Sequence, residues 1–235
     1  RVLDHSNDYL GAESLVTRNR KFINLLPNLT SKANHKTHNI ANPGCFATCI
    51  QLALLPLAAK GLLKEDVHIT ATTGSTGAGQ SLSATSHFSW RQNNLSIYKA
   101  FEHQHLNEIG QSLTQLQKGF SKDLNFIPYR GAFTRGIIAS LYTNCDLSIE
   151  KVEELYQSYY AAHPFVHISK SAIDLKQIVN TNKGLLQLQK NGNKLLITSC
   201  IDNLLKGASG QAVQNMNLLF GLDEKAGLNL KAAYF

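Results

Sequence analysis

The sequence lacks a long apolar run, a cluster of basic residues and any internal repeat. Its longest apolar stretch, residues 50–59, is interrupted by Gln51 and Pro56 and is too short to span a bilayer. The first ten residues do not show the basic-then-apolar pattern of an export signal. We therefore expect a cytoplasmic protein that does not contact a membrane.

Cysteines are few, and none form a C-x-x-C pair. That spacing is typical of structural zinc sites, so we expect no metal site. In a chain of 235 residues without an export signal, we expect the thiols to stay reduced in a cytoplasm. The four cysteines are Cys45, Cys49, Cys145 and Cys200.

Charged residues make up only 17% of the chain and hydrophobic residues 43%, a balance typical of a globular protein with a sizeable core. The net charge of +7 fits either ordinary solubility or attraction of an anionic ligand such as a phosphate ester. The lysines and arginines are scattered and not interleaved with aromatic residues, which argues against nucleic-acid binding.

Hydrophobic periodicity predicts helices and strands in mixed order. Residues 45–63 repeat at helical spacing, with a kink expected at Pro56 and an end at Gly61. Without strict alternation of strand and helix, we expect an α+β fold with a largely antiparallel mixed sheet. The other expected elements are strands at 2–4 and 67–72, a helix after Ser148, paired strands at 185–190 and 194–200 around Asn191-Gly192, and a last helix at 211–220.

Cys45 stands at a turn that opens a helix, in the segment Asn42-Pro43-Gly44-Cys45. Backbone N–H groups and the helix dipole favour an anion there, so we expect a lowered thiol pKa and a thiolate that attacks acyl groups. The alternative is a small buried core residue, the commoner fate of cysteine. Cys49, one helical turn later beside apolar residues, is expected in the core.

Two histidines, His103 and His105, lie two residues apart in the segment 102–109. They would share one side of a strand or straddle the start of a helix, and a neutral imidazole moves protons near pH 7. Glu108, three residues after His105, is expected to orient the pair. A metal site would need a third ligand.

Two glycine-containing segments qualify as site loops. Residues 74–79 read G-x-x-G-x-G after a strand, which is not a dinucleotide fingerprint, and we expect a tight loop lining an active site. In residues 203–215 two glycines precede a helix, which fits either an anion site or a closely packed helix entry.

Taken together, these segments resemble the N-acetyl-gamma-glutamyl-phosphate reductases. ANPGCFAT around Cys45 resembles the family's active-site signature, and HQHLNEI resembles its H-R-H-x-P-E-I segment. FIPYRGAFTRGII resembles a substrate-site segment, and NLLKGASGQAVQNMN resembles the late segment near the nicotinamide. The order and spacing agree over nearly the whole chain.

The resemblance implies a semialdehyde-dehydrogenase-like catalytic domain that reduces an N-acyl-glutamyl phosphate with NADP(H) through a thioacyl-cysteine, in arginine biosynthesis. Cys45 would be the nucleophile and His105 the acid/base, with His103 second. Arg135 would clamp a substrate carboxylate or phosphate, unless it forms a surface ion pair. The other expected site residues are Glu108 and Tyr98 for substrate, and Gly77, Asn203, Gly207 and Gln211 for cofactor.

The sequence also departs from the family pattern. Gln104, Asn107 and Tyr129 stand where Arg, Pro and His are common, which leaves the N-acyl group open. The family's glycine-rich phosphate turn is missing before Asn42, so we expect this polypeptide to bind NADPH poorly or not at all. We expect a Rossmann remnant at 1–44, a catalytic and oligomerisation domain at 45–202, and a C-terminal segment at 203–235 returning to the cofactor domain.

The expected partners are the small-molecule substrate and further copies of the chain, as a homodimer or homotetramer.

Two rival interpretations remain. One is an aspartate-semialdehyde or glyceraldehyde-phosphate dehydrogenase, whose cysteine contexts resemble N-C-T-T or S-C-T-T-N-C. The other is an inactive oligomerisation domain.

Overall fold

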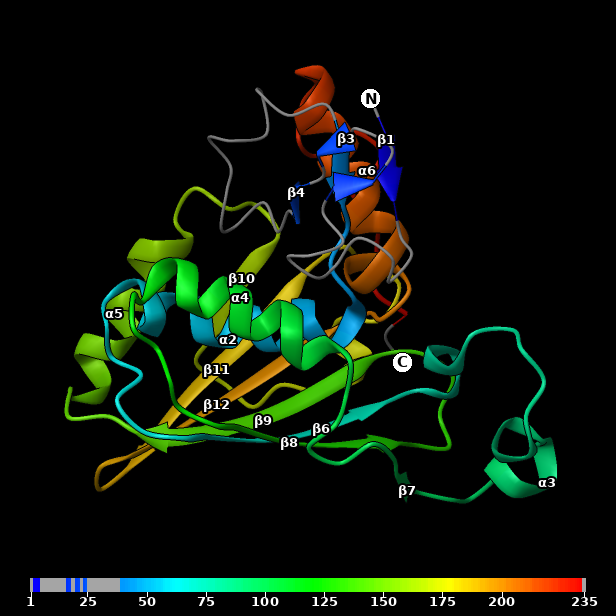
Figure 1. The fold of residues 1–235 in the computed structure, drawn as a ribbon, viewed down its shortest axis with the longest axis horizontal. Coiled ribbons are helices and arrows are strands. Elements are labelled where there is room, and N and C mark those ends of the chain that lie inside the picture. Colours follow the sequence, from blue (N-terminus) through cyan, green and yellow to red (C-terminus); the bar gives the residue numbers. More distant parts are fainter. Residues whose placement is uncertain (1, 5–15, 18–19, 22, 25–38, 234–235) are drawn as a thin grey trace.

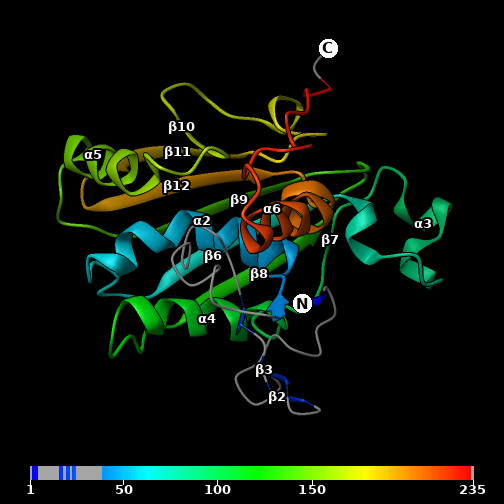
Figure 2. The same ribbon diagram turned by 90° about the horizontal axis from the view of Figure 1, so that it is seen from above.

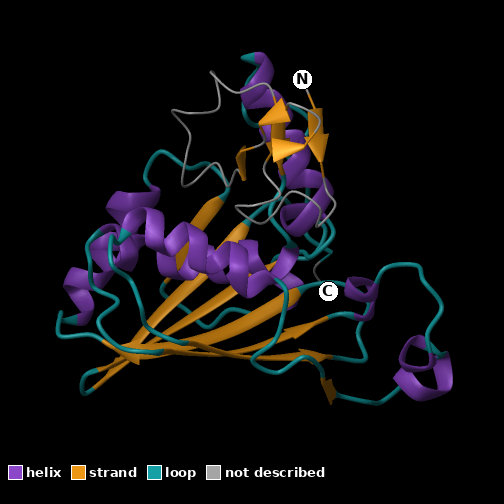
Figure 3. Cartoon of the chain, in the orientation of Figure 1, coloured by secondary structure: helices purple, strands orange, loops and turns teal. Residues whose placement is uncertain are grey.

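The computed structural model describes residues 2–4, 16–17, 20–21, 23–24 and 39–233. Its main feature is a seven-stranded sheet with helices on one face, as Figures 1 and 3 show. The strands of this sheet, in chain order, are β6 (Val67–Thr73), β7 (Ser96–Ile97), β8 (Leu124–Arg130), β9 (Ile137–Asn144), β10 (Val166–Ser169), β11 (Gly184–Asn191) and β12 (Lys194–Ile201).

The spatial order of the strands is β10-β11-β12-β9-β6-β8-β7. The pairs β10–β11 and β6–β8 are parallel, and the other four are antiparallel. The expected α+β fold with a largely antiparallel mixed sheet is confirmed. The β11–β12 hairpin also lies where Asn191-Gly192 predicted it, with Gly192 at a φ of 58°, where glycine is favoured.

Helix α2 (Cys45–Ala59) is the centre of the core and is buried from Phe46 to Ala58. A helix that is apolar or small on every side must be covered on every side. The sheet lies beneath it, and α4 (His105–Leu116) and α5 (Ile149–Tyr160) lie on the same face of the sheet (Figures 1 and 2). α2 therefore presents its first residue, Cys45, at one edge of a packed core.

Pro56 lies inside α2, and two tyrosines from α5 compensate for it. A proline has no N–H, so the carbonyl four residues earlier, that of Leu52, loses its helical donor. The Tyr160 hydroxyl donates to that Leu52 oxygen at 2.6 Å, and the Tyr156 hydroxyl donates to the next carbonyl, that of Ala53. Helix α2 thus continues past Pro56 to Ala59.

The C-terminal helix α6 (Gly210–Phe220) follows a turn of π-helix at Leu205–Ser209, where the sequence had predicted an ordinary turn. The Asn215 side chain donates to the Asn42 side chain at 2.9 Å, so α6 is tied to the residues just before α2. Near it, β5 (Asn39–Ala41) pairs in parallel with β1 (Val2–Asp4) and β4 (Ile23–Asn24). β2 (Val16–Thr17) and β3 (Arg20–Lys21) form a separate hairpin.

The segment 82–97 extends away from the sheet and returns to it at β7. It carries the four-residue helix α3 (Phe88–Arg91), on the right of Figures 1 and 2. A 3-10 turn, η4 (Ala84–Ser86), precedes α3. Among the helices in the described ranges, none combines the length and apolar character needed to cross a membrane.

Candidate active site

One pocket of about 960 Å³ is lined by residues from six segments of the chain. These segments are the start of α2, the end of β6 with the loop and 3-10 turn η3 (Ser75–Ala78) that follow it, the 3-10 turn η4, the turn before α4, the end of β8, and the π-helical turn before α6. The predicted site residues among its lining are Cys45, Gly77, Tyr98, His103, His105, Asn203 and Gly207. In the described part of the chain, no three His, Cys, Asp or Glu side chains are grouped to hold a metal ion.

Cys45 is the first residue of α2 and is partly exposed to this pocket. Burial of the sulfur raises the pKa of the Cys45 thiol to about 11. The expectation of a lowered pKa is therefore wrong for the free protein. The Phe46 N–H does lower the pKa, as the helix N-terminus predicted, but desolvation is the larger effect and the Glu108 carboxylate adds to it. Cys49 is buried against Ser199, as expected of a core residue.

The two histidines straddle the start of α4, the second of the two predicted arrangements. Their rings lie 4.6 Å apart, and the His103 ring packs edge-on against Phe46 at 5.4 Å. Burial lowers the pKa of His103 to about 4 and that of His105 to about 3, so both are neutral near pH 7. The His103 Nδ1 accepts the His105 backbone N–H at 3.2 Å, which leaves its proton on Nε2.

Glu108 lies between His105 and Gly44, the residue before the nucleophile. Its Oε2 accepts the Gly44 N–H at 3.2 Å, and its Oε1 lies 3.8 Å from His105 Nε2. A Cβ on Gly44 would lie 2.2 Å from the same Nε2, so only glycine allows this approach. Glu108 is itself buried and outside the pocket lining, which fits an orienting role better than substrate binding.

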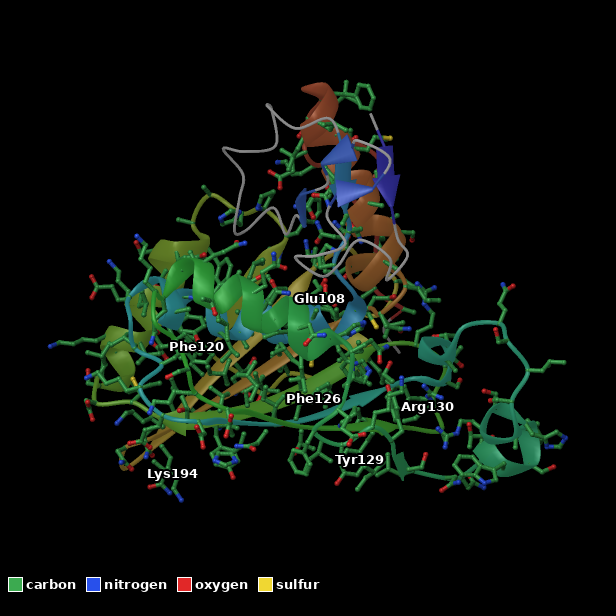
Figure 4. All side chains as sticks on the ribbon, in the orientation of Figure 1. Glu108, Phe120, Phe126, Tyr129, Arg130 and Lys194 are labelled. Carbon is green, nitrogen blue, oxygen red and sulfur yellow. The ribbon has the colours of Figure 1, made fainter. Side chains whose placement is uncertain are left out.

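Arg130 is a pocket residue that sequence reasoning missed. It ends β8, and its guanidinium lies 4.5 Å above the ring of Tyr98. Figure 4 shows Arg130 at the end of the sheet opposite Lys194. Burial raises the pKa of Tyr98 to about 12, so the phenol keeps its proton and Arg130 keeps its positive charge unneutralised by it. The available signal was that Arg130 lies in the segment FIPYRGAFTRGII, which resembles a substrate-site segment.

Arg135 occupies a different place from the one predicted. Its Nη2 lies 3.1 Å and 3.0 Å from the two carboxylate oxygens of the buried Asp202, and it does not line the pocket. One Asp202 oxygen also accepts the N–H groups of Leu204 and Leu205. The Arg135–Asp202 pair therefore shapes the turn that carries Asn203 into the pocket, and the predicted substrate clamp is corrected to this structural role.

The predicted cofactor residues divide into two groups. Asn203 and Gly77 line the pocket, and the Asn203 side chain is held by the Gly136 N–H at 2.7 Å and by Thr76 Oγ1 at 3.0 Å. Gly207 lies directly against the nucleophile, since a Cβ there would come within 2.7 Å of the Cys45 Cβ. Gln211 is buried in α6 outside the lining, with neither amide atom hydrogen-bonded to a described residue.

The loop that carries Tyr98 to His105 has an unusual backbone. Lys99 and Phe101 have φ angles of 46° and 64°, in the left-handed region that non-glycine residues rarely adopt. Lys99 lines the pocket and donates to the Gln104 side chain at 3.2 Å. Strained backbone of this kind persists where the surrounding structure holds it, and it often marks functional sites.

Comparison with known proteins gives a consistent result. Residues 45–203 match the family "Semialdehyde dehydrogenase, dimerisation domain". The chain is 57% identical, over its full length and 72% of theirs, to proteins of Flavobacterium johnsoniae and Bacteroides fragilis named N-acetyl-gamma-glutamyl-phosphate reductase.

Among solved structures, aspartate semialdehyde dehydrogenase II from Vibrio cholerae shares the fold. The TM-score is 0.71 at 13% identity, covering 93% of this chain and 72% of that one.

Proposed function

The chain belongs to the N-acetyl-gamma-glutamyl-phosphate reductases, a family of oxidoreductases, and on that premise we propose how its pocket works. The proposed reaction is the NADPH-dependent reduction of an N-acyl-gamma-glutamyl phosphate to the semialdehyde and phosphate, a step of arginine biosynthesis. The observation that supports it best is the single pocket in which Cys45, His105 and His103 converge.

In the first stage, the Cys45 sulfur attacks the gamma-carbonyl carbon. A C–S bond forms, the C–O bond to phosphate breaks, and a thioester remains on Cys45. His105 is neutral, so it can accept the thiol proton during the attack and pass it to the leaving phosphate. General-base assistance is needed here because the raised pKa of Cys45 leaves little thiolate at neutral pH.

In the second stage the thioester is reduced, and NADPH supplies the hydride when bound. Gly207 faces Cys45 without a side chain and leaves room beside the sulfur, while Gly77 and Asn203 form the neighbouring wall. We also propose Gln211 for the cofactor side, because its buried amide has no hydrogen-bond partner among the described residues, although it lies outside the pocket lining. The departing semialdehyde leaves Cys45 as a thiolate. Since the first proton left with the phosphate, a proton taken up from solvent and passed on by His105 restores the thiol.

We propose Arg130, in place of Arg135, as the group that binds an anionic part of the substrate, its phosphate or its carboxylate. A guanidinium binds either in a fork, and Lys99 adds a second positive charge to the same lining. Arg130→Met should therefore raise KM for the acyl phosphate by roughly tenfold or more while the melting temperature changes little. An unchanged KM would remove Arg130 from the substrate site.

The proposal is tested by measuring phosphate-releasing reduction with N-acetyl-gamma-glutamyl phosphate and, separately, with aspartyl phosphate. We expect activity with the first, and a loss of at least about a thousandfold in Cys45→Ser. The matched control is Cys49→Ala, one helical turn away in the core, which should keep most of the activity. Activity with aspartyl phosphate alone would favour the aspartate-semialdehyde dehydrogenase rival.

We also propose that the protein works in the cytoplasm as a homo-oligomer. The four cysteines form no disulfide, which fits a reducing compartment, and the matched family is described as a dimerisation domain. We retain the homodimer and the homotetramer as alternatives.

A further inference from the structure

The segment 82–97, which we call the arm, concentrates exposed apolar side chains. Residues of this size and character seldom gather in one exposed segment unless it binds something. Their exposed fractions are Leu82 101%, Phe88 74%, Leu95 59%, Ile97 55% and Trp90 39%. Residues between 82 and 90 also line an open hollow of about 830 Å³.

The arm folds through local hydrogen bonds. It is anchored to the body by Arg91 and by β7, whose Ser96 and Ile97 pair with Arg130 and Tyr129 of β8. The Asn94 side chain donates to the Trp90 carbonyl at 2.9 Å, within the arm. The buried Arg91 guanidinium donates to the carbonyl of Arg130 at 3.0 Å and to Ser96 Oγ at 3.0 Å. The anchor of the arm is therefore the backbone of the residue that we place at the substrate.

The charge of the arm indicates its partner. Arg91 is its only charged residue, and that guanidinium is used internally. A twofold contact brings the same patch of two copies together. On a chain of net charge +7, a patch without charged side chains avoids repulsion between the copies. The arm also lies within the region that matches a dimerisation domain.

We propose that the arm binds a second copy of this chain and that this contact completes the active site. Thr85, in the arm, lines the same pocket as Cys45 and His105. Docking the arm on a partner fixes the part of the pocket that Thr85 lines. Through Arg91, it also holds Arg130 over Tyr98. The proposal goes beyond the proposed reaction, because it assigns the surface of self-association and makes the pocket depend on it.

The first test is the double variant Leu82→Asp, Phe88→Asp, which places two like charges in the contact. Its control, Gln115→Asp, Gln157→Asp, adds the same two charges at exposed positions of α4 and α5. Light scattering should show a smaller assembly for the arm variant at protein concentrations where the wild type and the control keep their mass. An arm variant with wild-type mass at every concentration overturns the proposal.

The second test needs no substitution and does not depend on any activity. Trp90 is the only tryptophan in the sequence, so its quenching by acrylamide reports the exposure of the arm. We expect weak quenching at high protein concentration and several times stronger quenching on dilution, in step with the fall in mass. Quenching that stays strong while the mass shows an oligomer would place the contact elsewhere and overturn the proposal.

Activity distinguishes this inference from the proposed reaction. At dilutions that dissociate the protein, the acyl-phosphate reductase rate per chain should fall several-fold and recover on concentration. A protein that dissociates and keeps its full rate overturns the coupling between the arm and the pocket. An absence of reductase activity at all concentrations contradicts the proposed reaction, while the mass and quenching results still decide on the arm.

Discussion

At the scale of the residue, Cys45 shows that burial and a helix N-terminus shift the pKa of a thiol in opposite directions. The sequence correctly placed it at a helix start, but the tertiary cluster of Phe46, His103 and His105 that surrounds it is built from residues far apart in the chain. Desolvation in that cluster outweighs the helix N-terminus, and this could not be inferred from the turn alone.

Alkylation of Cys45 by iodoacetamide should follow the raised pKa of the thiol. Since only the thiolate reacts, the rate should rise about tenfold per pH unit from pH 7 and level off only near pH 11. Glu108→Gln removes a carboxylate that raises this pKa, so its alkylation at pH 8 should be about two to three times faster. A plateau below pH 9 in the wild type would contradict the account. Peptide mapping identifies the alkylated cysteine.

Lys206 is a second residue whose environment changes its chemistry. It is fully buried in the π-helical turn, its Nζ donates to Gln214 Oε1 at 2.7 Å, and burial lowers its pKa to about 7. The unfolded chain therefore binds more protons between pH 7 and 10, so this residue makes the folded state more stable as pH rises through that window.

The pH dependence that Lys206 adds is open to measurement. Going from pH 7 to pH 9, the free energy of unfolding of the wild type should rise relative to that of Lys206→Met, by up to about 1.4 kcal/mol per pH unit. Urea unfolding at the two pH values gives the difference in unfolding free energy between the two proteins. The contributions of the titratable groups that both proteins contain cancel in this difference. Parallel pH profiles would mean that Lys206 keeps its proton in the folded state.

At the scale of the element, the sequence predicted α2, the β11–β12 hairpin and the last helix because each has its own periodicity and turn residues. It did not predict how α5 compensates for Pro56, because the hydroxyl donors lie about a hundred residues away from their acceptors. For the same reason the pairing of Arg135 with Asp202, 67 residues apart, was missed.

The α2–α5 contact predicts a thermodynamic cycle. Tyr160→Phe removes the donor to the buried Leu52 carbonyl and should cost about 1–3 kcal/mol of unfolding free energy. In a Pro56→Ala background the new N–H can bond to that carbonyl, so the same Tyr160→Phe change should cost clearly less. Urea unfolding of the four proteins measures the coupling. Equal costs in both backgrounds would refute the compensation.

The π-helical turn before α6 predicts a steric effect on catalysis. A Gly207→Ala methyl would lie 2.7 Å from the Cys45 Cβ, so turnover should fall at least about tenfold although the protein still folds. Gly110→Ala is the control, because a Cβ there meets nothing within 4 Å and alanine is the better helix former. If Gly207→Ala kept wild-type turnover, the turn would not be setting the position of the nucleophile.

At the scale of the whole molecule, the sheet and α2 bring six segments of the chain to one pocket. The sequence motifs predicted seven of the residues that line this pocket, because reactive and polar side chains cluster in short segments of the chain. Arg130 was missed because only the parallel pairing of β6 with β8 brings the end of its strand beside the glycine loop. The arm could not be predicted, since the exposure of its apolar residues is a property of the assembled fold.

The central claim is that Cys45 forms a covalent acyl intermediate. The most direct measurement is the intact mass of the protein after incubation with N-acetyl-gamma-glutamyl phosphate in the absence of NADPH. The account predicts a mass increase equal to one acyl group, mapped to Cys45 and removed by hydroxylamine, with release of one phosphate. An adduct of the same size in Cys45→Ser, or phosphate release at the wild-type rate by that variant, would contradict it.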